Sequence, residues 1–111
     1  MSTIFSRIIS GELPSDIVYE DERCMAFRDI NPAAPLHVLV IPKKEIPQLN
    51  DMTEGDETLV GHLMRVAGIV AKQEGFDDFR VVVNCGAGAG QTVFHLHLHV
   101  LSGRRLNWPP G

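Results

Sequence analysis

Three histidines at alternate positions, His95, His97 and His99, carry the strongest chemical signal in this 111-residue chain. Alternate residues of a strand point to the same face of a sheet. The spacing therefore predicts a strand over 93–101, with three imidazoles on one face and apolar residues such as Phe94 packed on the other. Such a cluster could bind a metal ion, supply a nucleophile with acid–base groups, or be a solvated polar face.

A glycine-rich loop over 85–92 leads directly into this strand. Glycines let backbone N–H groups approach an oxyanion closely, and Gln91 and Thr92 add side-chain donors. The loop lacks the Gly-Lys-Ser/Thr of a P-loop, and a strand rather than a helix follows it. Loop and histidines together indicate phosphate chemistry without a bound metal. An open zinc site, completed by Asp29 or His37, is the alternative.

The elements expected around these residues form an α+β meander rather than a βαβ fold. Thr3 is expected to cap a short helix, and Thr53 and Asp56 form a near capping box before a long helix that ends at Gly75. The core stripe of the long helix comprises Leu59, Val60, Leu63, Met64, Ala67, Val70 and Ala71. The strands are expected over 16–20, 22–29, 36–41, 79–84 and 93–101. The strand over 36–41 is apolar on both sides, which predicts a central place in the sheet.

Composition and charge exclude several classes of protein. Ten Lys and Arg against fourteen Asp and Glu give a net charge of −4, which argues against nucleic acid as the main partner. No apolar run is long enough to span a membrane, and the first ten residues lack the apolar stretch of a signal peptide. Two cysteines without CxxC spacing, Cys24 and Cys85, indicate reduced thiols and a cytoplasmic protein. The length predicts a single domain over 1–111.

The segment 95–101 matches the His-φ-His-φ-His-φ-φ signature of the histidine triad (HIT) family, with every φ apolar. The chain resembles the Hint branch of that family along almost its whole length. Further matching segments are 4–5, 27–30, 35–37, 40–44, 83–84, 90–92 and 108–111. The C-terminal ending resembles Hint proteins, which are purine nucleoside phosphoramidases, more than Fhit-like hydrolases or uridylyltransferases. The implied fold is a five-stranded, mainly antiparallel sheet with one long and one short helix.

The resemblance implies a two-step hydrolysis of AMP-amine bonds, and of acyl-AMP bonds. His97 attacks the α-phosphorus, and water then hydrolyses the nucleotidyl-histidine. The other ring nitrogen of His97 should donate to a backbone carbonyl. His99 would contact phosphate oxygens, and His37 would support the triad from another strand. His95 would either orient the site or contact the substrate directly. Thr92 stands where the branch usually has Ser, and its hydroxyl would protonate or orient the leaving amine.

The resemblance also implies a nucleoside pocket. Asp29 would accept both ribose hydroxyls, and apolar side chains would enclose the purine. Those side chains are Phe5, Ile8, Phe27, Ile30 and Leu39. Asn84, Gly90 and Gln91, with Thr92, His97 and His99, would complete the nucleotide site.

The implied partners are a purine nucleotide (AMP, GMP or an adenosine phosphoramidate) and a second copy of the chain. Hint proteins are homodimers whose sheets join edge to edge. The tail 102–111, with Trp108, would then dock near the partner's site. No cofactor or metal is expected. A nucleotide-binding scaffold with vestigial turnover and a zinc-binding regulator are the alternatives.

Overall fold

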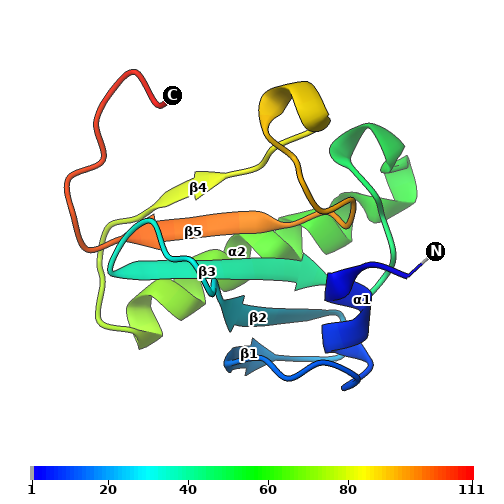
Figure 1. Ribbon diagram of the computed structural model, residues 1–111. Helices are drawn as coiled ribbons and strands as arrows, with labels where there is room; N and C mark the ends of the chain where they lie inside the picture. Colours follow the sequence, from blue (N-terminus) through cyan, green and yellow to red (C-terminus); the bar gives the residue numbers. More distant parts are fainter. Residues whose placement is uncertain (1) are drawn as a thin grey trace.

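The computed structural model describes residues 2–111 and contains one five-stranded antiparallel sheet with the strand order β1-β2-β3-β5-β4. The strands are β1 (Ile17–Glu20), β2 (Cys24–Arg28), β3 (Leu36–Pro42), β4 (Arg80–Val82) and β5 (Leu98–Ser102). A short helix α1 (Ile4–Ile9) precedes them, and a long helix α2 (Glu57–Gln73) connects β3 to β4 (Figure 1). The predicted α+β architecture is confirmed.

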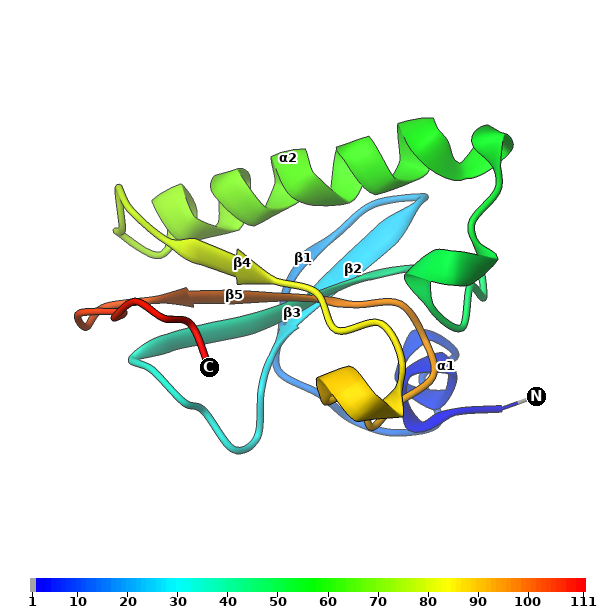
Figure 2. The same cartoon turned by 90° about the horizontal axis from the view of Figure 1, so that it is seen from above.

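Helix α2 runs along one face of the sheet, whereas α1 and the glycine-rich loop lie on the other (Figure 2). Every residue of β3 is buried, which confirms the predicted central strand. The buried residues of α2 are Leu63, Val66, Ala67, Val70 and Ala71. The expected stripe was wrong at Met64, which is half-exposed, and Val66 takes the buried position. Positions 63, 66–67 and 70–71 form the face toward the sheet, so Met64 falls beside it.

Both predicted helix starts have their capping contacts. The Thr3 hydroxyl accepts a hydrogen bond from the Ser6 N–H at 3.1 Å, and the Ser6 hydroxyl accepts one from the Thr3 N–H. Thr53 and Asp56 form the same reciprocal box around a 3-10 turn that leads into α2. After α2, Gly75 has a φ of 93°, a left-handed conformation that glycine adopts readily.

The last two strands are shorter than the sequence predicts. β5 begins at Leu98, where its pairing with β3 begins opposite Val40. The Leu96 N–H instead donates to the Ile46 carbonyl at 2.7 Å, so the chain leaves the sheet before β5. His95 and His97 therefore precede the strand. Phe94 is 41% exposed rather than packed in the core. β4 likewise covers three residues instead of the predicted 79–84.

The C-terminal tail lies against the end of the sheet. The Arg80 guanidinium donates to the carbonyls of Leu106 and Asn107 at 3.0 and 2.9 Å. The Trp108 side chain is 81% exposed, so the tail does not bury its ring within this chain. Within residues 2–111, no helix combines the length and the apolarity needed to cross a membrane.

Candidate active site

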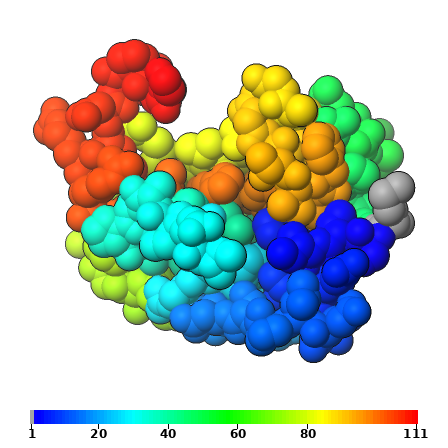
Figure 3. Space-filling model, viewed as in Figure 1, coloured from blue at the N-terminus to red at the C-terminus, as the bar shows by residue number. Residues whose placement is uncertain are grey.

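A cavity of about 460 Å³ opens on the face of the sheet that α1 covers. Residues of α1, of the segment after β2 and of the segment that enters β5 line it; these segments are blue, cyan and orange in Figure 3. The lining includes all five side chains predicted to enclose the purine, which are Phe5, Ile8, Phe27, Ile30 and Leu39. Asp29, Thr92, His97 and His99 also line it. The structure thus gathers most of the predicted site around one cavity.

His97 has one ring nitrogen fixed and one free. Its Nδ1 lies 2.7 Å from the His95 carbonyl oxygen, which can only accept, so Nδ1 carries the proton. Nε2 then holds a lone pair, which is the nucleophilic form of the ring. Burial lowers the pKa of His97 below its ordinary value, so the imidazole is neutral at pH 7. The Phe5 ring packs edge-on against it, with centroids 5.0 Å apart.

His37 and His99 form a chain with a defined proton order. The Ala33 N–H donates to His37 Nδ1 at 2.9 Å, so the proton of a neutral His37 is on Nε2. That nitrogen lies 2.9 Å from His99 Nδ1 and donates to it. A neutral His99 therefore carries its own proton on Nε2, where it can be donated to a ligand in the cavity. Asp29 Oδ2 lies 3.4 Å from His37 Nε2.

Burial, together with the charge that His97 and His37 would carry when protonated, lowers the pKa of His99 to about 4. The pKa of His37 is also lowered by burial, against the opposing effect of the Asp29 carboxylate. Each of these rings is thus neutral at pH 7. The site presents a lone pair on His97 and an N–H donor on His99 rather than a set of cations.

His95 does not face the cavity, contrary to the expectation that all three imidazoles share one open face. Its side chain is fully buried, and Nε2 donates to the Pro42 carbonyl at 2.7 Å. The correction follows from the chain leaving the sheet before β5. The His95 side chain bonds to Pro42 at the end of β3, and the His95 backbone carbonyl accepts the proton of His97 Nδ1. His95 therefore connects β3 to His97. This arrangement agrees with an orienting role.

The backbone N–H groups of the glycine-rich loop bond mainly within the loop. The Gln91 side chain holds the loop in place and is not free to donate to a ligand. The buried Gln91 side chain donates to the carbonyls of Pro47 and Val93 and accepts the Gly86 N–H at 2.8 Å. The N–H groups of Ala89, Gly90 and Gln91 also bond within the loop. The expected donor role of the Gln91 side chain was therefore wrong, and the N–H groups of Gly86, Ala89, Gly90 and Gln91 are used within the loop rather than left for an oxyanion.

Two further predicted residues, Asn84 and Gly90, are not among the residues that line the cavity and lie against each other. Gly90 has a φ of 102°, and a Cβ at that position would lie 3.6 Å from Asn84 Nδ2. Only glycine adopts this conformation readily, so Gly90 shapes the loop that leads to Thr92. Thr92 itself lines the cavity.

The triad does not converge on a common point for a metal ion. In the part of the chain that the structure describes, the candidate ligand group beside the cavity is Asp29, His37 and His99, whose ligand atoms lie within 4.8 Å of one another. The sequence-based alternative named Asp29 or His37 as the residue that completes a zinc site. The structure places both of them beside one triad histidine.

Sequence reasoning missed the segment 13–15 and Asn31, which also line the cavity. The Asn31 N–H donates to Asp29 Oδ1 at 2.8 Å and orients the carboxylate. A signal for the segment was present, because Leu13 and Pro14 directly follow the helix whose apolar face was expected in the pocket.

The comparisons with known proteins agree with this geometry. The HIT domain family matches residues 10–106. An uncharacterised HIT-like protein of Synechocystis sp. is 59% identical over 98% of this chain and 96% of its own length. The 14 kDa zinc-binding protein of Zea mays is 51% identical over 98% of this chain and 88% of its own. The chain belongs to the HIT family.

A solved structure extends the comparison to the whole fold. The HIT family hydrolase from Legionella pneumophila Philadelphia 1 superposes with a TM-score of 0.96 at 44% identity, covering 99% of this chain and 100% of that one. The fold is therefore the HIT fold, and this similarity supports a hydrolase-type role.

Proposed function

We propose that this protein is a Hint-branch purine nucleoside phosphoramidase that acts through a covalent nucleotidyl-His97 intermediate. The observation that carries the proposal is the contact between His97 Nδ1 and the His95 carbonyl at 2.7 Å. It leaves Nε2 unprotonated beside a cavity with the volume and apolar lining expected of a nucleoside site. Neutral imidazole is a nucleophile at pH 7 without a separate general base.

The reaction proceeds in two displacements at phosphorus. His97 Nε2 forms a bond to the α-phosphorus, the P–N bond of the substrate breaks, and the amine leaves with a proton that reaches it from solvent through the Thr92 hydroxyl. Water then attacks the same phosphorus and the bond to Nε2 breaks. AMP and neutral His97 are regenerated, and the proton lost by the water returns to solvent. His99 Nε2–H stabilises the charge on the phosphate oxygens. Thr92 lines the same cavity, and its hydroxyl would donate to the departing amine.

The same cavity accounts for recognition of the nucleoside. Phe5, Phe27 and Leu39 are buried and give the purine an apolar seat. Ile30 is 88% exposed at the rim, where a bound base would cover it. Asp29 retains acceptor capacity beyond its bond from the Asn31 N–H, because a carboxylate has about four lone-pair sites. The ribose hydroxyls can donate to these sites.

Zinc binding is the second candidate function, favoured by the ligand group Asp29, His37 and His99. The maize relative is named for zinc binding. An ion there would occupy His99 and compete with the phosphate. The two functions therefore differ in a simple way, because the phosphoramidase works in EDTA and a zinc-dependent protein does not.

We also propose that the chain forms a homodimer through β4, the edge strand of the sheet. An unpaired edge exposes backbone donors and acceptors that a second copy can satisfy. The exposed Trp108 lies on the tail beside this edge and would reach the partner's site. Sedimentation equilibrium at micromolar concentration should give about 25 kDa, twice the chain mass of 12.3 kDa. The mass of one chain at all concentrations would exclude the dimer.

Rapid-quench kinetics with an adenosine phosphoramidate that carries a fluorescent amine test the proposed reaction. A burst of amine release should accompany one acid-labile, base-stable nucleotide per active chain, because an N–P bond to imidazole has that stability. Peptide sequencing should place the nucleotide on His97. Binding without a burst would favour the scaffold alternative, and activity lost in EDTA and restored by zinc would favour the metal-dependent one.

A further inference from the structure

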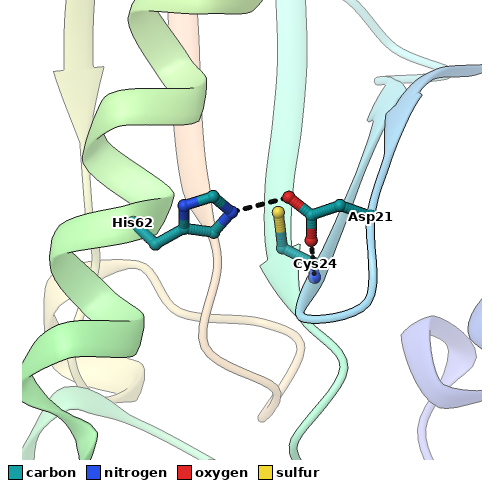
Figure 4. Close-up of side chains that lie close together, drawn as sticks. All are labelled: Asp21, Cys24 and His62. Carbon is teal, nitrogen blue, oxygen red and sulfur yellow. Dashed lines mark hydrogen bonds and ion pairs between the residues drawn. The ribbon is translucent and has the colours of Figure 1, made fainter.

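A second cluster of titratable side chains lies on the α2 side of the sheet. Asp21 follows β1, Cys24 begins β2, and His62 points toward both of them from α2 (Figure 4). One ligand atom of each residue lies within 4.8 Å of the others. Cys24 belongs to the core beneath α2, whereas Phe5 packs with the core of the opposite face, beside His97. The cluster is therefore separate from the candidate active site.

We propose that Asp21, Cys24 and His62 form a binding site for a zinc ion. Carboxylate, thiolate and imidazole are the three side-chain groups that zinc takes as ligands in proteins. A set that mixes sulfur and nitrogen disfavours calcium and magnesium, which prefer oxygen. Three protein ligands leave the fourth tetrahedral position to water. The donor atoms are already gathered, so the ion would require little movement of the backbone.

The Asp21 carboxylate is held in a position that suits a ligand. The backbone N–H groups of Arg23 and Cys24 donate to its Oδ1 at 2.8 and 2.9 Å. Its Oδ2 is directed to the other side, where it lies 2.6 Å from His62 Nε2 and 2.9 Å from the Tyr19 hydroxyl. Oδ1 is thus held by backbone donors, whereas Oδ2 is held by side-chain donors, and an ion would replace the bond from His62 Nε2–H to Oδ2. Supporting bonds of this kind orient ligands in metal sites.

The protons of the cluster balance when an ion binds. The Arg23 guanidinium lies 3.1 Å from His62 Nδ1 and donates to it, so the ring proton is now on Nε2. Coordination through Nε2 moves that proton to Nδ1 and releases the exposed Arg23 side chain. The Cys24 thiol gives its proton to solvent. Thiolate and carboxylate together then match the two positive charges of the ion.

Two of the three side chains in the cluster are partly exposed to solvent. The side chains of Asp21 and His62 are 27% and 10% exposed, and Cys24 lies fully buried behind them. Burial, with the negative charge of Asp21, raises the pKa of the Cys24 thiol to about 12. The thiol therefore keeps its proton until a metal ion displaces it, which agrees with an inert cysteine in the absence of metal.

Titration of the purified full chain with cobalt(II), followed by displacement with zinc(II), tests the site. Cobalt in a tetrahedral zinc site absorbs in the visible range, and a thiolate ligand adds a charge-transfer band in the near ultraviolet. The wild type should bind one cobalt with both features. The matched control Cys85→Ser should behave identically, because Cys85 lies in the glycine-rich loop, outside the cluster.

Two variants make the assignment specific. Cys24→Ser should lose the charge-transfer band. His62→Gln should weaken metal affinity by more than about tenfold, and it keeps a side chain that can donate to Asp21 if Cys24→Ser does not fold. A wild-type spectrum without the thiolate band, or unchanged affinity in His62→Gln, would overturn the proposal. Phosphoramidate turnover is not a readout here, so failure of this site and failure of the proposed function are distinguishable.

Discussion

The histidine site at the cavity and the Asp21–Cys24–His62 cluster lie on opposite faces of one sheet and differ in how their polar atoms are bonded. On the cavity side, backbone groups of His95 and Ala33 fix the protons of His97 and His37. One atom of His97 thereby stays free to react. On the α2 side, His62 and Asp21 bond to each other at 2.6 Å. The difference teaches that chemistry depends on which atoms the backbone leaves unpaired, rather than on the residue types alone.

The substitution His97→Ala should have the largest effect, because it removes the reactive atom of the cavity site. Turnover of an adenosine phosphoramidate should fall by several orders of magnitude, because no other free imidazole nitrogen is placed to form the covalent intermediate. AMP binding should persist, because Asp29 and the apolar lining are unchanged. Calorimetry for AMP and single-turnover kinetics measure the two quantities. Wild-type turnover in this variant would exclude His97 as the nucleophile.

The His37–His99 chain should show the next largest effect. His37→Ala removes the donor to His99 Nδ1, so the proton of His99 is no longer held on Nε2. We expect kcat to fall about a hundredfold, as when one donor to a developing charge is lost, with KM changing less. His37→Gln is the matched control, since its amide N–H can replace that donor and should restore part of kcat. Equal loss in both variants would contradict a role in proton placement.

The pH dependence of kcat/KM should show a smaller effect of the same burial of the cavity histidines. The pKa values of His97 and His99 are lowered by burial, to about 4 for His99. The active, neutral rings should therefore persist as pH falls below about 6.5, the usual histidine value. We expect the acidic limb of kcat/KM to lie below about pH 6.5, the ordinary histidine value, because both shifts are downward. If kcat/KM already falls at or above about pH 6.5, the pKa values of these histidines are not lowered by burial, and the prediction is wrong.

The same shifts predict how stability changes with pH. The folded state holds these histidines neutral, whereas the unfolded chain protonates them below about pH 6.5. Their effect is absent above that value. The free energy of unfolding should decrease as pH falls from about 6.5 toward about 4. In His97→Ala this decrease should be smaller, which chemical denaturation at several pH values can measure.

Local patterns in the sequence predicted the elements, and the family resemblance predicted most of the cavity lining and the bond from His97 to a backbone carbonyl. Neither predicted the hydrogen-bond partners of His95 and Gln91. The apolar run of β3 and the caps at Thr3 and Thr53 are local signals, and the structure has them as expected. The burial of His95 depends on a bond to the Pro42 carbonyl, 53 positions away in the chain. The bracing role of Gln91 depends on a bond to the Pro47 carbonyl, 44 positions away. Alternation along a single strand contains no information about such partners.

The cluster beneath α2 was missed for the same reason. The position of His62 on the long helix gives no sequence signal for a partner on another element. Its contact with Asp21 joins residues 41 positions apart, and its side chain is only 10% exposed. Cys24 was considered only for its oxidation state. Long-range packing of α2 on the β1–β2 turn brings the three side chains together.

The smallest expected effect is that of Thr92→Ser, which tests the leaving-group side of the cavity. Serine keeps the hydroxyl that would donate to the departing amine and removes one methyl group from the lining. The reaction class should not change, and turnover of a small amine substrate should stay within about threefold of wild type. Substrates with bulky amines should gain more, because the missing methyl leaves space beside the scissile bond. Thr92→Val is the matched control, since it keeps the shape and loses the hydroxyl. If Thr92→Val retains full kcat, the hydroxyl does not assist the leaving group, and the amine must take its proton from another donor such as His99 or water.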